Sequence, residues 1–187
     1  MKFRDVVIQT KVFFLLLFVL GCSKTIKLED GSDVSWKHSY DEFKQRHFLK
    51  SSKIGFPGLM SDHAIYLQVS SVDGSDVVDC ILRLRYRGPD WRFYEKVTFL
   101  VDRESTTIDS FDTDRDVLSG TRIVENVYLE LDTVVLEKIS LASEVKVRFT
   151  GNYSNDETLK SNHVDVFKQA RKLLSSKEVF QQAVSRF

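Results

Sequence analysis

Strict alternation of side-chain type over residues 78–87 constrains the fold of this chain more than any other feature. The two alternating sets are Cys80, Leu82, Leu84 and Tyr86 on one side, and Ile81, Arg83, Arg85 and Arg87 on the other. Successive side chains of a β-strand point to opposite faces of a sheet. The pattern therefore predicts a strand with one buried face and one face toward solvent.

The same alternation recurs in other segments, which we expect to be strands. They cover residues 65–70, 91–101, 106–111, 122–131 and 145–149. Asp73-Gly74 and Gly88-Pro89-Asp90 are turn signals between neighbouring segments. The connections are too short for crossover helices, so the strands should be antiparallel. The sequence predicts an α+β fold built on one antiparallel β-sheet or sandwich of about six strands.

Residues 39–52 carry a helical pattern. Ser39 is a favourable N-cap, and Glu42 follows three residues later, as in a capping box. Tyr40, Phe43 and His47 would then share one face of the helix. We therefore expect a helix before the first long strand.

Two further helices are expected toward the C-terminus. Asp132 or Thr133 can cap the first of them. Asn162 can cap the last helix, and Ser175-Ser176 can divide it in two. We expect these C-terminal helices to pack against the sheet.

The N-terminus carries an export pattern. Basic residues precede an uninterrupted apolar run over residues 12–20, and the small residue Gly21 precedes Cys22. Nine residues of helix rise about 14 Å, roughly half of a hydrocarbon core, which is short for a transmembrane helix. The stretch Val19-Leu20-Gly21-Cys22 resembles the lipobox of bacterial lipoproteins. In that family the cysteine becomes the lipid-modified first residue of the mature protein.

The resemblance implies an organisation and a location. Residues 1–21 would be a lipoprotein signal peptide, residues 22–37 the lipidated N-terminus and tether, and residues 38–187 a single α+β domain. Ser23 stands where many inner-membrane lipoproteins have aspartate, which implies the periplasmic face of the outer membrane. Two alternatives stay open: an uncleaved anchor helix that starts at Val6, and secretion without a lipid.

Charge and cysteine content narrow the partners. The chain has 27 basic and 27 acidic residues, so no excess of positive charge favours nucleic acid. If Cys22 carries lipid, Cys80 is left single. A single thiol excludes an internal disulfide and a metal site of the usual cysteine type. Because Cys80 lies in an apolar, strand-like stretch, we expect it to be buried.

The arginines of the alternating segment are the first candidate site. Arg83, Arg85 and Arg87 form a row on the outward face of the predicted strand, and Trp91 follows closely. Such a row could bind an anion, either a lipid headgroup, a lipopolysaccharide phosphate or an acidic partner protein. The alternative is an ordinary solvated face with carboxylates such as Glu130 opposite the arginines.

An acidic segment is a weaker candidate. Asp112, Asp114 and Asp116 have the spacing that opens an EF-hand calcium loop. Val117 and Ile123 stand where that loop needs glycine and a bidentate glutamate. We expect a polar loop between strands, with a non-standard calcium site as the alternative.

A catalytic interpretation rests on two carboxylates. Glu95 and Glu125 fall on the inward faces of their strands by strict alternation, and such a pair could act as acid and base. The chain has no nucleophile elbow, zinc-protease helix or glycine-rich phosphate loop. No motif indicates a cofactor.

These observations favour a non-enzymatic envelope lipoprotein that binds a protein partner or an envelope component. The alternative is a lipid- or small-ligand-binding β domain whose cavity is lined by Trp91, Phe93 and Phe99. An enzyme that uses Glu95 and Glu125 is the third hypothesis.

Overall fold

A computed structural model describes residues 25–28, 34–57, 61–118, 120 and 122–186. The expected signal peptide, residues 1–21, and Cys22 lie outside the described residues. Within them the chain forms 12 strands and three helices, so an antiparallel fold with C-terminal helices packed on it is confirmed. The expected number of about six strands is wrong, because the described residues form 12 strands in two sheets.

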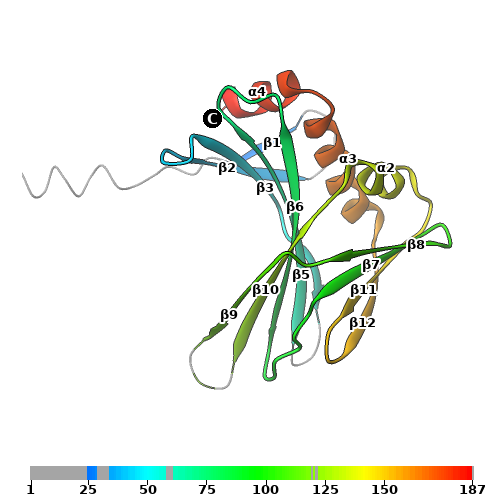
Figure 1. The fold of residues 1–187 in the computed structure, drawn as a ribbon. Coiled ribbons are helices and arrows are strands. Elements are labelled where there is room, and N and C mark those ends of the chain that lie inside the picture. The colour runs from blue at the N-terminus through cyan, green and yellow to red at the C-terminus, as the bar shows by residue number, and fades with distance from the viewer. Residues whose placement is uncertain (1–24, 29–33, 58–60, 119, 121, 187) are drawn as a thin grey trace, which may run out of the picture.

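The large sheet has eight strands. In spatial order, seven of them are β1 (Thr25–Lys27), β2 (Ser35–Asp41), β3 (Arg46–Ser51), β5 (Asp62–Val72), β6 (Val78–Gly88), β10 (Ile123–Glu130) and β9 (Asp112–Val117); β4 (Ile54–Pro57) also pairs with β5. All of these pairings are antiparallel. Figure 1 shows that β5 and β6 run through both halves of the molecule and join them.

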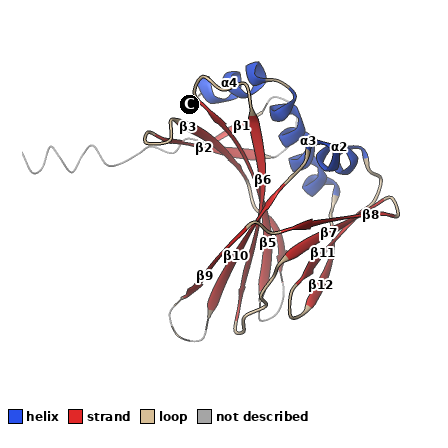
Figure 2. Ribbon diagram, viewed as in Figure 1, coloured by secondary structure: helices blue, strands red, loops and turns tan. Residues whose placement is uncertain are grey.

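The small sheet and the helices complete the fold. The small sheet contains, in order, β12 (Ser154–Thr158), β11 (Val145–Thr150), β7 (Lys96–Val101) and β8 (Glu104–Asp109). The helices are α2 (Thr133–Leu141), α3 (Ser161–Ser175) and α4 (Lys177–Ser185). Figure 2 shows them gathered at one end of the molecule, beside both sheets. None of these helices is long and apolar enough to cross a membrane.

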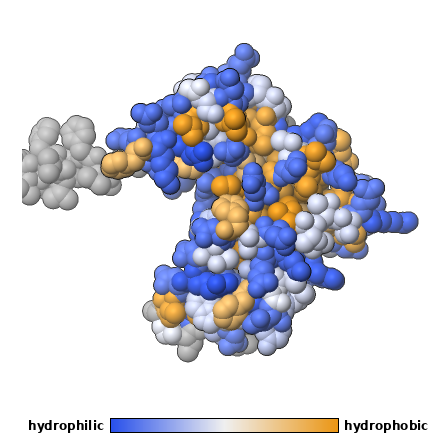
Figure 3. All heavy atoms as spheres, in the orientation of Figure 1, coloured by the Kyte–Doolittle hydropathy of each residue, from blue (hydrophilic) through white to orange (hydrophobic). Residues whose placement is uncertain are grey.

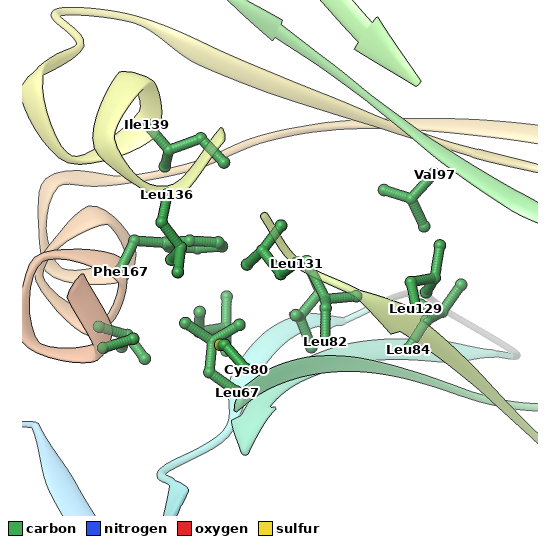
Figure 4. Packing of buried hydrophobic residues seen from close by; sticks show 14 of the residues in the cluster. Leu67, Cys80, Leu82, Leu84, Val97, Leu129, Leu131, Leu136, Ile139 and Phe167 are labelled. Atoms are coloured by element: carbon green, nitrogen blue, oxygen red, sulfur yellow. The ribbon is translucent and has the colours of Figure 1, made fainter. Parts of the chain in front are cut away.

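The core lies between the large sheet, the helices and the small sheet. Figure 4 shows Leu67, Cys80 and Leu82 of the large sheet near Leu136 of α2 and Phe167 of α3. As expected, Cys80 is buried, and it is the free cysteine of the described residues. Hydrophilic side chains cover most of the face in Figure 3.

Several local expectations are confirmed. Gly74 adopts φ +76° in the turn between β5 and β6, a conformation that suits glycine. Asp132 caps α2, and its carboxylate accepts a hydrogen bond of 2.7 Å from the backbone N–H of Val134. Ser176 separates α3 from α4 and caps α4. Asn162 is not a cap, since α3 begins one residue earlier, at Ser161.

The helix expected over residues 39–52 is wrong. This segment belongs to the β2–β3 hairpin, which turns over residues 42–45. Leu49 and Ser51 are buried and Lys50 between them is half-buried, the two-residue period of a strand. The long-range pairing of β3 with β5 outweighs a local capping pattern.

Three other boundaries also differ from expectation. The supposed tether over residues 22–37 includes β1 and the start of β2, and Trp36 is completely buried, so the domain begins before residue 38. The strand expected over residues 91–101 begins only at Lys96, after a loop. A further strand, β12, follows the one expected to be last.

Candidate anion-binding face

Four basic side chains gather on the outer face of the large sheet. They are Lys37 of β2, Lys50 of β3, and Arg83 and Arg85 of β6, and together we call them the cationic face. Each directly follows a buried residue that points to the core, namely Trp36, Leu49, Leu82 and Leu84. The cationic face is therefore turned away from the core and the helices.

The strand register brings these residues together from segments far apart in the sequence. Lys37 lies directly opposite Lys50 in the β2–β3 pair. β5 then separates β3 from β6, and its Tyr66 and Ala64 lie opposite Arg83 and Arg85. The Lys50 ammonium nitrogen lies 4.5 Å from the centroid of the Tyr66 ring. Tyr66 therefore lies between Lys50 of β3 and Arg83 of β6.

The four cations raise one another's electrostatic energy. The pKa of Lys50 is lowered, first by its burial and then by the positive charges of Arg83, Arg85 and Lys37. Among the described residues, no carboxylate forms an ion pair with any of the four. A bound anion would supply the missing negative charge.

The two guanidinium groups of the cationic face differ in their hydrogen bonds. Arg83 donates from Nε and Nη2 to Oδ1 of Asn126, at 3.2 and 2.7 Å, and lies over the Tyr128 ring. The Nε of Arg85 is buried and has no hydrogen-bond partner among the described residues. An unsatisfied buried donor is costly, so Arg85 is held in this position without full hydrogen-bond compensation from the described residues.

The expected carboxylate opposite the arginines is not there. In β10, Tyr128 lies opposite Arg83 and Asn126 lies opposite Arg85, whereas Glu130 lies opposite Ile81. Glu130 therefore does not pair across the strands with these arginines, and the ordinary solvated face loses its main support.

Two of the predicted site residues do not belong to the group of charges around Lys50. Arg87 is exposed near the end of β6 and lies opposite Asp62, whose carboxylate forms an ion pair with Lys53. Trp91 lies in the loop before β7 and packs against the core. The structure thus joins Arg83 and Arg85 with Lys37 and Lys50, not with Trp91.

Glu95 and Glu125 do not form the expected buried pair. Glu125 is completely buried, but Glu95 is exposed, because the loop before β7 breaks the alternation. The Glu125 carboxylate accepts hydrogen bonds of 3.2, 3.0 and 2.7 Å from the backbone N–H groups of Arg92, Phe93 and Tyr94. Arg115 supplies a fourth donor at 3.3 Å. Glu125 therefore fixes this loop against β10.

A second buried polar group joins the two sheets. Tyr94 donates to Oδ1 of Asn155 at 2.7 Å, and its oxygen lies 2.7 Å from Nε2 of His63. Burial lowers the pKa of His63 to about 4, and the positive charge of Arg92 acts in the same direction. His63 is thus a neutral, core histidine at physiological pH.

The acidic segment is a strand, not the expected loop. Asp112, Asp114 and Asp116 alternate along β9, and so share one face of a strand instead of surrounding a common point. Among the described residues, no group of three or more His, Cys, Asp or Glu side chains is arranged to hold a metal.

The aromatic residues expected to line a cavity for an apolar ligand do not surround a common space. Phe99 packs edge-on against Phe167 of α3, with ring centroids 6.0 Å apart, whereas Phe93 is exposed. An open groove of about 370 Å³ lies on the small sheet instead, between residues such as Leu100, Lys146 and Arg148. That groove contains none of the three aromatic residues named for the cavity.

Sequence reasoning missed Lys37 and Lys50. The sequence patterns predict a tether around Lys37 and a helix around Lys50, so neither residue is expected on a sheet. The alternation of Leu49, Lys50 and Ser51 was the available signal, but no local pattern predicts the spatial order of the strands.

No family model, curated protein or solved structure matches this chain.

Proposed function

We propose that this chain is a lipid-anchored, non-enzymatic protein of the bacterial envelope, at the periplasmic face of the outer membrane. Its cationic face binds an anionic envelope component that carries phosphate groups. The observation that carries this proposal is the convergence of Lys37, Lys50, Arg83 and Arg85, with no carboxylate of the described residues paired to them.

The chemistry of the cationic face suits a phosphate. Guanidinium groups donate in a fixed planar fork that matches phosphate oxygens, and an ammonium group adds a compact charge. The rings of Tyr66 and Tyr128 lie beneath Lys50 and Arg83 and give the face a partly apolar surface. A phosphate-bearing lipid headgroup combines these two properties.

The anchor strengthens such an interaction. Acyl chains on Cys22 would hold the domain at the membrane surface, where headgroups are concentrated, so even a weak site would be occupied. The β1 strand that follows the proposed anchor lies beside β2, and Thr25 is opposite Lys37. The described chain therefore begins beside Lys37, three residues after the proposed anchor.

Vesicle binding tests the proposal. A chain that starts at residue 22 with Cys22→Ser keeps every described element of the fold. We expect it to bind phosphatidylglycerol-containing vesicles more tightly than phosphatidylcholine vesicles, with an affinity that falls as salt increases. Lys50→Glu should weaken this binding by about ten-fold or more, since each basic residue near an anionic surface contributes about 1 kcal/mol.

Lys172→Glu is the matched control, because it makes the same charge change at an exposed position of α3. Its binding should be close to that of the parent chain. Equal binding to both kinds of vesicle, or equal losses in the two variants, would contradict the proposal. Retention of an acidic protein but not of anionic vesicles would replace the lipid with a protein partner.

A further inference from the structure

The β2–β3 hairpin ends in an exposed aromatic residue. Phe43 lies in the turn over residues 42–45, which we call the hairpin tip, and its side chain is fully exposed. Figure 1 shows that this hairpin projects from one end of the molecule, and Figure 3 shows apolar atoms at the end of the projection. Exposing a whole phenylalanine to water is unfavourable unless another apolar phase covers it.

The hairpin tip is held in a defined conformation. The Asp41 carboxylate accepts hydrogen bonds of 3.1 Å from the backbone N–H groups of both Phe43 and Lys44. The carbonyl of Gln45 accepts a hydrogen bond of 2.8 Å from the backbone N–H of Asp73, in the neighbouring β5–β6 turn. These hydrogen bonds therefore hold the turn in a conformation in which the Phe43 side chain points to solvent.

A histidine pair supports the base of the hairpin. Nε2 of His38 lies 3.0 Å from Nδ1 of His47, and Nε2 of His47 lies 3.2 Å from the Asp73 carboxylate. Tyr40 donates to the same carboxylate at 2.8 Å. These contacts hold the hairpin against the end of β5. The position of Phe43 is therefore fixed relative to the rest of the domain.

The chain direction places the proposed anchor at the same end of the molecule. β2 runs from Ser35 toward the hairpin tip, and β1 runs antiparallel to it from Thr25, opposite Lys37. The chain therefore enters β1 from the side of the hairpin tip. Cys22 precedes Thr25 by three residues, which span at most about 10 Å. Lys37 to Asp41 covers about 13 Å of β2 in the same direction.

We propose that Phe43 inserts into the membrane leaflet that holds the lipid anchor, as a second contact that fixes the orientation of the domain. This inference rests on the proposed anchoring at Cys22. Glu42 and Lys44 flank Phe43 with opposite charges, so insertion is driven by apolar burial and not by attraction to anionic lipid. Unlike binding by the cationic face, it should not depend on salt.

Site-specific fluorescence tests the insertion. Phe43→Cys in the full lipidated protein can be labelled with an environment-sensitive dye, because Cys80 is buried and does not compete. In phosphatidylcholine vesicles we expect a blue-shifted emission, and quenching by nitroxide groups on the acyl chains. Phe111→Cys is the matched control, since Phe111 is an exposed phenylalanine in the connection between β8 and β9. Its label should stay in a water-like environment.

The acyl mass on Cys22, measured on the same sample, separates the two proposals. If Cys22 is acylated but the labels at 43 and 111 behave alike, insertion is overturned and anchoring stands. If Cys22 is not acylated, the anchoring proposal fails. In that case, vesicle quenching at residue 43 alone would keep the hairpin tip as a membrane contact, and its absence would overturn this inference too.

Discussion

Trp36 donates its indole N–H to Oε1 of Gln169 over 2.6 Å, and this bond joins β2 to α3. Both side chains are completely buried, although 133 positions separate them in the sequence. The bond fixes the N-terminal edge of the large sheet to a helix of the core. Because β1 pairs with this strand from Thr25, the folded domain begins three residues after Cys22, the proposed lipid anchor.

Removing the acceptor should destabilise the domain. Gln169→Ala leaves the Trp36 indole N–H buried with its partner gone, and we expect a loss of about 2 kcal/mol in the free energy of unfolding. Urea unfolding measures the change. Gln182→Ala, at an exposed position of α4, should stay within about 0.5 kcal/mol of the parent. Equal effects in the two variants would show that the bond contributes little.

The two candidate carboxylates should differ sharply in their effect on stability. Glu125→Ala removes the acceptor of three backbone N–H groups and leaves Arg115 without its partner, so we expect a cost of about 3–5 kcal/mol. Glu95→Ala changes an exposed side chain and should cost less than about 0.5 kcal/mol. Thermal and urea unfolding of both variants check this, and similar losses would contradict the structural role of Glu125.

Stability should fall in acid because of His63. Its folded-state pKa of about 4 lies below the ordinary value of 6.5, so the unfolded chain binds the proton more readily. The contribution of His63 is complete above pH 6.5 and declines as the pH falls toward 4, by about 3 kcal/mol in all. His63→Phe should flatten the pH dependence over this window. If the free energies of unfolding of the parent protein and of His63→Phe decreased equally from pH 7 to pH 4, this role of His63 would be refuted.

Cys80 should be unreactive in the native protein. Burial raises the pKa of its thiol to about 12, and Asp79 adds to the effect, so almost no thiolate forms near neutral pH. A thiol reagent should modify Cys80 only after denaturant is added, at the rate of global unfolding. Fast labelling without denaturant would mean that the core around Leu67 and Leu82 opens readily.

The sequence was most informative where one face of a strand is buried. Alternation identified β6 and β10, and the caps at Asp132 and Ser176 located the ends of helices, because both signals arise from interactions within a few residues. The β2–β3 hairpin was missed for the converse reason. Its turn has no glycine, and Gln45 adopts φ +47° without a sequence signal for it.

The candidate site was only half predictable. Arg83 and Arg85 share one strand, so their common face followed from a period of two. Lys37 and Lys50 join them only through the spatial order of β2, β3, β5 and β6, which depends on long-range pairing. Likewise, Glu95 faces solvent and not the core, because it lies in the loop before β7, where the two-residue alternation does not hold.

Mass spectrometry of the mature N-terminus, on protein extracted from bacterial membranes, tests the central claim most directly. We expect an N-terminal peptide that begins at Cys22 and carries the added mass of acyl chains and glycerol. Cys22→Ser should abolish that modification and leave the precursor uncleaved. A mature chain that begins at another residue, or an unmodified Cys22 in the membrane fraction, would contradict the account.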